Sequence, residues 1–276
     1  MIYRAICLTF SILLLAVPAG ALELCGKKAQ GEILRGYAPE AGKIMLDGKE
    51  YMLSPSGYFM IAFGRDEQPQ KKLSLIDKVG NTENFNLQVA PTKWDIQNIK
   101  GIPQKKVTPS KEDEKEILRE RGGVREALQD KLGKNYWQKG FIRPVEGRIS
   151  GNFGGQRIMN GKKMNPHQGM DIAAPEGTPV KASSGGIVRL SGGNFFYSGN
   201  MVIIDHGQQL FTIYAHLKKT NVKTGDYVRQ GQIIGQVGKT GRVTGPHLHW
   251  GASLNGVRFN PVSLLHMNND DFCFNL

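Results

Sequence analysis

The chain has 276 residues and a formal net charge of +12, with 36 Lys and Arg against 24 Asp and Glu. Hydrophobic residues make up 39% and charged residues 22%, a balance typical of folded globular domains. Many short apolar runs and 35 glycines, 21 of them at or after residue 141, exclude a coiled coil, a collagen-like repeat and a protein with many membrane spans. This length predicts about two domains, each able to bury a core.

The N-terminus carries the pattern of a secretory signal peptide over residues 1–21. Arg4 precedes an apolar run over 5–17, and the segment ends in an Ala-x-Ala sequence at 19–21. This run is shorter than the roughly 20 residues that a membrane-spanning helix needs, and an uncleaved N-terminal anchor is the alternative. We therefore predict a periplasmic or secreted protein with no stable membrane insertion after cleavage.

Cysteine usage agrees with export. Cys7 would leave with the signal peptide, so that Cys25 and Cys273 remain near opposite ends of the mature chain. Two such cysteines commonly pair in an oxidising compartment. A bond that closes so long a loop could stabilise the fold by up to about 5 kcal/mol through chain entropy. Two unpaired thiols are the alternative.

Residues 22–100 are predicted to form a small all-β domain, with regulation as a candidate role. Segments 43–46 and 49–53 flank Asp47-Gly48, which is the strongest short-range signal for a two-residue hairpin turn. Further strand candidates are 57–63 and 85–89. This domain contains no histidine, so we expect no chemistry in it.

Residues 101–140 are predicted to form a charged helical connector. Ser110-x-x-Asp113 has the form of a capping box, and a charged run over 111–121 follows it. Because Gly122-Gly123 interrupts this pattern, we predict two short amphipathic helices, the second over 124–132. Such a charged run is most often a solvated helix face, and we assign it no binding role.

Residues 141–276 are predicted to form the second domain. Strand candidates recur every 8–12 residues, which indicates an antiparallel sheet or a barrel-like sandwich. They are 186–190, 201–205, 210–216, 232–237 and 248–254. All six histidines of the chain fall here, at 167, 206, 216, 247, 249 and 266. We expect His206 to be structural and His266 to be incidental.

Two spacings in this domain are typical of a metal site. His167 and Asp171 form a His-x-x-x-Asp motif, and His247 and His249 lie two apart on a strand, where both project to the same side of the sheet. Imidazole and carboxylate are ligands of Zn²⁺, and a catalytic zinc site uses three protein ligands plus a water. Either motif alone is weak, but both together, with His216 nearby, indicate a metal centre.

Several segments of the same domain resemble the lysostaphin/LytM-type zinc endopeptidases, in the motif order of that family. They are 151–157, 165–180, 202–207 with 214–217, and 238–250. The resemblance spans about residues 145–265, and several ordered motifs are more specific than any one of them. It implies a mainly β chain whose last part is an antiparallel, barrel-like LytM-type peptidase domain.

The resemblance also implies the roles of the site residues. His167, Asp171 and His249 would bind one Zn²⁺ per chain, and a zinc-activated water would attack a peptide carbonyl. His216 and His247 would be catalytic, one taking the proton of the water and the other stabilising the oxyanion. Which of the two is the base stays open. The implied reaction is hydrolysis of peptide cross-links or stem peptides of bacterial peptidoglycan.

A second function stays open beside the enzyme. Some relatives have lost zinc ligands and activate other wall hydrolases, so a catalytically silent wall-binding activator is the alternative. The presence of all five site residues favours the enzyme. Relatives also often cover the groove with an N-terminal segment, which implies a latent form here. The positive charge of an exported protein favours an anionic cell wall, so we predict peptidoglycan and no nucleic acid as partner.

Overall fold

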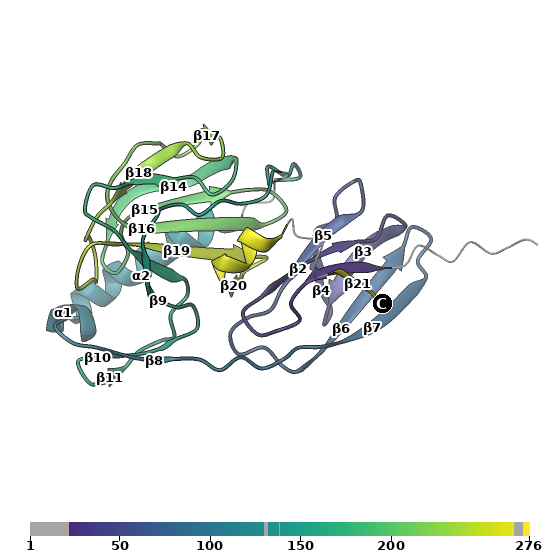
Figure 1. Ribbon diagram of the computed structural model, residues 1–276, viewed down its shortest axis with the longest axis horizontal. Helices are drawn as coiled ribbons and strands as arrows, with labels where there is room; N and C mark the ends of the chain where they lie inside the picture. The colour runs from purple at the N-terminus through teal and green to yellow at the C-terminus, as the bar shows by residue number, and fades with distance from the viewer. Residues whose placement is uncertain (1–21, 130–131, 138, 268–272) are drawn as a thin grey trace, which may run out of the picture.

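The computed structural model describes residues 22–129, 132–137, 139–267 and 273–276 (Figure 1). The predicted signal peptide lies outside these residues. Strands dominate and helices are few, which confirms the prediction of a mainly β chain. Within the described ranges, no helix has the length and apolar character needed to cross a bilayer.

The N-terminal strands form two antiparallel sheets, on one side of the molecule in Figure 1. The first has the order β21-β1-β2-β5, formed by Cys273–Asn275, Glu23–Gly26, Ile33–Tyr37 and Tyr58–Ala62. The second has the order β4-β3-β6-β7, formed by Lys49–Tyr51, Ala41–Leu46, Gln70–Asp77 and Thr82–Gln88. The predicted hairpin is confirmed as β3–β4. Its turn residues Asp47 and Gly48 have φ values of +48° and +78°, as the favoured two-residue turn requires.

The last described strand returns to the first. β21 pairs antiparallel with β1, and Cys25 lies opposite Cys273 in the register of the two strands. The two cysteines form a disulfide across a sequence separation of 248 residues. The predicted pairing is therefore present.

A ten-stranded antiparallel sheet makes up most of the C-terminal half. Its main path has the order β17-β14-β15-β16-β19-β12-β9, with β13, β18 and β20 paired beside it. In chain order the strands are β9 (Arg148–Gly151), β12 (Met170–Ala173), β13 (Pro179–Lys181), β14 (Gly186–Phe195), β15 (Gly199–Asp205), β16 (Leu210–Thr220), β17 (Tyr227–Val228), β18 (Ile233–Val237), β19 (His247–Leu254) and β20 (Val257–Phe259). A short 3₁₀ helix, Pro261–His266, follows β20. The main path ends at β17 and β9, so the antiparallel prediction is confirmed while the sheet is open and not a closed barrel.

One apolar core cluster joins the small sheets and the large sheet. It includes Phe59 and Phe63 from the N-terminal part and Trp250 and Phe259 from the large sheet, all of them fully buried. Burying aromatic side chains of this size is the largest favourable contribution to folding that such a core makes. The core therefore supports the strand β19, on which two of the predicted site histidines lie.

A third, three-stranded sheet was not predicted. It consists of β8 (Ile96–Ile99), β10 (Gln156–Met159) and β11 (Lys162–Lys163), in the order β11-β10-β8. β8 leaves the N-terminal part and pairs in parallel with β10, where Gln97 lies opposite Arg157 (Figure 1). The segment that connects the N-terminal sheets to the helices therefore adds a strand next to the predicted metal site.

The connector contains α1 (Gln104–Val107) and α2 (Lys111–Ala127). The predicted capping box at the start of α2 is confirmed, because the Ser110 side chain and the Asp113 side chain each accept from the other's backbone N–H. The prediction of two helices broken at Gly122-Gly123 is wrong, since α2 runs through both glycines.

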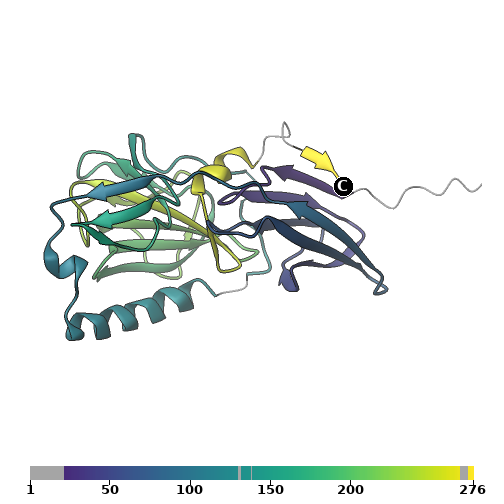
Figure 2. The same ribbon diagram turned by 90° about the horizontal axis from the view of Figure 1, so that it is seen from below.

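Packing explains why α2 continues through the two glycines. Each glycine costs a helix about 1 kcal/mol relative to alanine. However, Val124, Ala127 and Leu128 pack against an apolar cluster on the large sheet that includes Phe211 and Ile213. Figure 2 shows α2 running along this part of the molecule. Tertiary contacts therefore hold the last turns in helical form, which local sequence does not reveal.

Candidate metal centre

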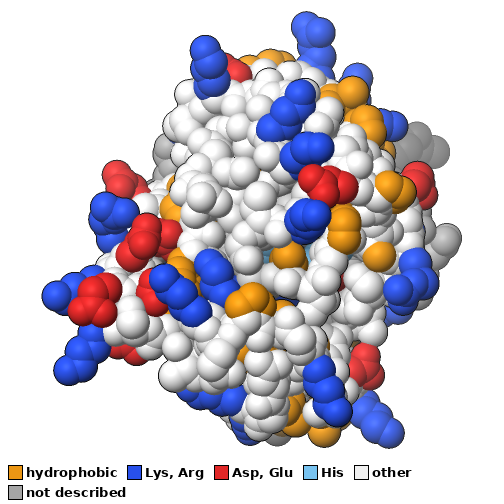
Figure 3. All heavy atoms as spheres, turned by 90° about the vertical axis from the view of Figure 1, so that its left-hand side faces the viewer, with side chains coloured by type: hydrophobic (Ala, Val, Ile, Leu, Met, Phe, Trp, Pro, Cys, Tyr) orange, Lys and Arg blue, Asp and Glu red, His pale blue; other side chains and the backbone are white. Residues whose placement is uncertain are grey.

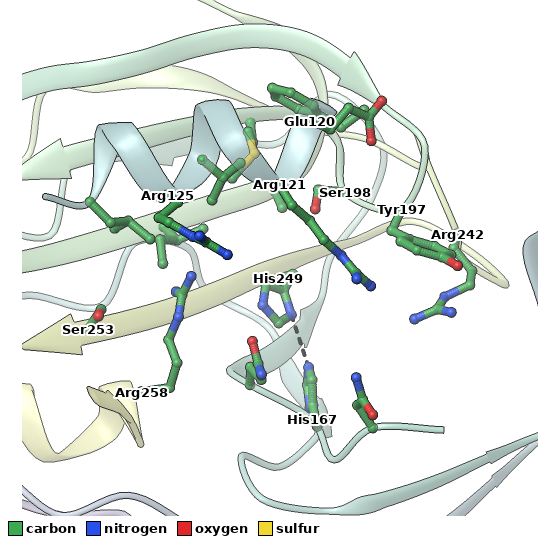
Figure 4. A pocket seen from close by; sticks show the side chains of 18 of the residues that line it. Glu120, Arg121, Arg125, His167, Tyr197, Ser198, Arg242, His249, Ser253 and Arg258 are labelled. Atoms are coloured by element: carbon green, nitrogen blue, oxygen red, sulfur yellow. Dashed lines mark hydrogen bonds between the residues drawn. The ribbon is translucent and has the colours of Figure 1, made fainter. Parts of the chain in front are cut away.

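Three predicted ligands meet between two paired strands. Asp171 on β12 lies directly opposite His249 on β19, and His167 lies just before β12. Asp171 Oδ1 is 2.9 Å from His249 Nδ1 and 3.0 Å from His167 Nε2. The two histidine nitrogens are themselves 2.9 Å apart, as the dashed line in Figure 4 marks. One oxygen and two nitrogens thus face a common point.

The chemistry of these donors fits a zinc ion. Two imidazole nitrogens and one carboxylate oxygen, all within 4.8 Å of one another, are a donor set that Zn²⁺ accepts at about 2.0–2.2 Å from each ligand atom. His167 Nδ1 lies 2.9 Å from the carbonyl oxygen of Asn152, an acceptor, so that Nδ1 carries the proton and Nε2 is free to bind metal. Three protein donors leave a coordination position for a water or a substrate.

His216 and His247 complete the cluster. His247 Nδ1 lies 2.9 Å from the carbonyl oxygen of Gly245, and His216 Nδ1 lies 2.9 Å from that of Thr240. Both rings therefore donate through Nδ1 and leave Nε2 unprotonated. The ring centroids of His216 and His247 are 4.8 Å apart. The structure thus brings all five predicted site residues together.

A break in strand β16 aims His216 at the cluster. Ala215 pairs with His249 on β19, but Leu217 already pairs with Val237 on β18, so the strand changes partner at His216. His216 has a φ of +63°, in the left-handed region that costs a residue other than glycine about 1–2 kcal/mol. This backbone conformation points the imidazole toward His247 and His249.

The environment keeps most of the cluster's imidazoles neutral. Burial lowers the pKa of His167 to about 4, and burial with the neighbouring histidines lowers the pKa of His216 well below its ordinary value. The pKa of His247 is also lowered, mainly by burial. Burial alone would raise the pKa of Asp171, but its hydrogen bonds and charge interactions with His167 and His249 lower it well below its usual range. An ionised carboxylate with neutral imidazoles is the state that binds a metal ion.

Two further residues shape the site, and sequence reasoning gave them no role. The Arg157 guanidinium forms an ion pair with Asp171 Oδ2, which leaves Oδ1 to face the histidines. Gly169 leaves room for the His249 ring, because a Cβ there would lie 2.7 Å from its Cε1 and Nε2 atoms. Both residues lie in segments that resemble the zinc endopeptidases, which was the available signal for them.

His206 lies outside the cluster. Its Nδ1 is 2.6 Å from the carbonyl oxygen of Gly185 and its Nε2 is 2.7 Å from Thr212 Oγ1, and the ring is fully buried. Thr212 Oγ1 also lies 2.9 Å from the Tyr214 hydroxyl oxygen. This buried network fits the structural role that the sequence predicted for His206.

His206 should make the fold sensitive to acid. Burial lowers its pKa from 6.5 to about 4. Between these two pH values the imidazole is protonated in the unfolded chain but neutral in the folded chain. Its contribution to stability is therefore complete above pH 6.5 and is lost as the pH falls toward 4. The loss amounts to about 3 kcal/mol. Urea unfolding at pH 7.5 and pH 4 should show a smaller acid loss for His206→Gln than for wild type, and equal losses would contradict this assignment.

A cavity of about 630 Å³ opens beside the metal centre. Residues of α2 line one side of it, and His167, His216 and His249 line another. Glu120 and Arg121 belong to the charged run that we expected to be a solvated face; Arg121 is exposed as expected, whereas Glu120 is half-buried and accepts the backbone N–H of Phe196. A substrate that reaches the histidines would therefore also meet α2.

The comparisons with known proteins agree on one family. The sequence pattern of peptidase family M23 matches residues 165–261, a range that holds all five predicted site residues. The peptidoglycan DD-endopeptidase ShyC of Vibrio cholerae is 44% identical over 144 residues, which are 49% of this chain and 33% of the relative. The DD-carboxypeptidase/endopeptidase Mpg of Neisseria meningitidis is 45% identical over 138 residues, 50% of this chain and 30% of the relative. The chain thus spans about a third of the length of these curated relatives.

A solved structure matches over a larger part of the chain. A crystal structure from Pseudomonas aeruginosa, described as a candidate peptidase M23, has a TM-score of 0.70 and 29% sequence identity. The match covers 87% of this chain and 96% of that one. It therefore includes the N-terminal strands as well as the large sheet.

Proposed function

We propose that this chain, whose residues 165–261 match the pattern of peptidase family M23, is a zinc-dependent endopeptidase that hydrolyses peptide cross-links or stem peptides of bacterial peptidoglycan. The observation that carries the proposal is the convergence of His167, Asp171 and His249, with donor atoms 2.9–3.0 Å apart. His216 and His247 stand beside them. This geometry places the groups that would hold a metal ion, which can polarise a peptide carbonyl, next to groups that can transfer a proton.

In this proposal His167 Nε2, Asp171 Oδ1 and His249 Nδ1 hold one Zn²⁺ per chain. When bound, zinc supplies a Lewis acid that can polarise a carbonyl and lower the pKa of a water to about 7. Arg157 fixes the orientation of Asp171 through its ion pair with Oδ2. Outer contacts of this kind hold ligands in place before the metal arrives.

His216 and His247 then handle the protons. Their Nε2 atoms are unprotonated, since each Nδ1 lies 2.9 Å from a backbone carbonyl oxygen. One imidazole accepts the proton of the attacking water, and thereafter delivers it to the leaving amine. The other would take a proton from solvent at Nε2, donate a hydrogen bond from it to the oxygen on which negative charge develops, and return the proton to solvent afterwards.

The substrate proposal rests on relatives and on charge. Two relatives are named as peptidoglycan DD-endopeptidase and DD-carboxypeptidase/endopeptidase, which supports peptidoglycan here. The net charge of +12 favours an anionic wall, and Figure 3 shows more basic than acidic side chains on one face. With the signal peptide pattern at 1–21, this supports a periplasmic or secreted location.

The domain division is part of the same proposal. We assign 22–100 to an N-terminal β unit with a candidate regulatory role, 101–140 to the connector, and 141–276 to the peptidase unit. β21, at the end of the last range, pairs with β1 of the first. The start of the N-terminal unit and the end of the peptidase unit would thus be held together by this strand pairing.

The alternative is a wall-binding activator without catalysis. Such a protein would not need a complete ligand set. Here both proton-handling histidines and all three candidate ligands lie in one cluster, which favours the enzyme over the activator.

The test uses purified residues 22–276 and isolated peptidoglycan. We expect close to one zinc per chain by elemental analysis, and soluble muropeptides whose masses identify the bond cut. Removing zinc with a chelator should stop release, and restoring zinc should recover it. Zinc binding without any release would favour the activator. A protein that binds no zinc would mean that the ligand assignment is wrong.

A further inference from the structure

Three arginines converge on the cavity beside the metal centre. Arg121 and Arg125 lie one turn apart on α2, and Arg258 lies on β20. All three line the cavity that also contains His167 and His249. In Figure 4 the two α2 side chains extend from the helix toward the space around His249, and Arg258 extends into it from the opposite side. The guanidinium groups thus come from two elements that are distant in sequence.

No protein carboxylate neutralises these groups. Within the described part of the chain, none of the three arginine side chains forms an ion pair or a hydrogen bond. Glu120 also lines the cavity, but its carboxylate accepts the backbone N–H of Phe196 at 2.9 and 3.0 Å. Asp171 is already engaged by Arg157 and the histidines. The wall of the cavity therefore carries surplus positive charge.

Like charges that face one cavity repel each other, and the repulsion grows as water is excluded. Arg121 and Arg125 are also four residues apart on one helix, a spacing at which like charges destabilise it. Arg258 is half-buried, and burial lowers its pKa to about 10. An anion in the cavity would relieve all three effects at once. Guanidinium groups suit a carboxylate, because their planar fork matches its two oxygens.

The α2 wall is fixed to the large sheet. Val124, Ala127 and Leu128 pack on the sheet's apolar cluster, and Glu120 binds the backbone of Phe196. A capping box secures the first turn of the helix. The backbone that carries Arg121 and Arg125 is thus held in position before a ligand binds, which lowers the entropy cost of binding.

We propose that Arg121, Arg125 and Arg258 form a subsite for the carboxylate groups of an acidic peptide substrate. This inference rests on the proposed function and narrows its substrate class to stem peptides whose carboxylates are free and not amidated. The scissile bond would lie at the histidine cluster while the acidic part of the peptide lies between α2 and β20. A carboxylate is favoured because a peptide delivered to the metal centre carries that anion itself.

The test compares two forms of one peptide on the zinc-loaded 22–276 protein. The first form is a cross-linked stem peptide with free carboxylates, and the second is the same peptide with its carboxylates amidated. We expect the Arg121→Gln/Arg125→Gln variant to lose about 100-fold in kcat/KM on the free form, about tenfold per arginine, mainly through KM. On the amidated form the variant and wild type should differ by less than about threefold. Zinc content should not change.

Arg119→Gln is the matched control. Arg119 lies on the same helix, its side chain is 81% exposed, and it faces Glu116 at 3.6 Å. Removing this charge should leave kcat/KM unchanged for both the free and the amidated peptide. Because Arg121 and Arg125 are exposed, their replacement should not impair folding. Arg258→Lys keeps the charge but loses the planar fork. It should lower kcat/KM for the peptide with free carboxylates and leave kcat/KM for the amidated peptide unchanged.

A binding measurement separates this inference from the proposed function. Calorimetry with an uncross-linked stem tetrapeptide should show tighter binding of the free form than of the amidated form, and the double arginine variant should abolish that preference. If the preference is present but no cross-link is ever cut, the proposed function fails and the subsite stands. If both forms are cut and bound equally well, or if the double variant loses the same factor on both, the subsite is overturned and the hydrolase stands.

Discussion

Replacing His249 with alanine should remove zinc and hydrolysis together. His249 Nδ1 is one of three donors, and it also lies 2.9 Å from both His167 Nε2 and Asp171 Oδ1. The variant would leave two ligands, which is too few for the three-ligand site that a catalytic zinc requires. We expect less than a tenth of the wild-type zinc content by elemental analysis, and muropeptide release at background.

His266→Ala is the control for this prediction. His266 is exposed and lies at the end of the 3₁₀ helix, outside the cluster. The His266→Ala protein should keep both its zinc content and its activity, which would exclude a general effect of losing a histidine. A His249→Ala protein that still bound one zinc and released muropeptides would refute the proposed ligand set.

Replacing His216 or His247 with alanine should separate metal binding from catalysis. Neither residue belongs to the proposed ligand set, so zinc content should stay near one per chain. Loss of a positioned acid or base lowers kcat by about 10²–10⁴-fold, and we expect that range for each variant. The measurement pairs elemental analysis with turnover on a cross-linked peptide.

The same two variants can identify the base. Added imidazole should restore part of the activity of the variant that lacks the base, because a small base can enter the space left by the missing ring. Rescue of one variant alone would assign that role. Loss of zinc along with activity in either variant would instead make that histidine a ligand and contradict our assignment.

Local sequence patterns predicted the parts of this site, but not how they meet. The His-x-His spacing on a strand places His247 and His249 on one side, and His-x-x-x-Asp places His167 near Asp171. What joins the two motifs is the pairing of β12 with β19, in which Asp171 faces His249. Register between strands some 78 residues apart in sequence is a long-range property. The resemblance to known peptidases supplied that link.

Other features had no local signal. His216 reaches the cluster only because β16 changes partner there, with a left-handed residue that sequence does not mark. The two glycines of α2 suggested a break, yet packing on the large sheet kept the helix continuous. By contrast, the Asp47-Gly48 hairpin and the Ser110 capping box were predictable, since both depend on a few adjacent residues.

The disulfide between Cys25 and Cys273 closes a covalent ring between positions that are 248 residues apart in sequence. A protease that nicks the backbone once, anywhere inside that ring, cannot release a fragment, because both pieces stay attached through the sulfur atoms. A cut in the connector would therefore leave the two halves travelling as one molecule until a reductant opened the bond. Shedding of the peptidase unit from its N-terminal partner would then require two chemical events, one hydrolytic and one reductive.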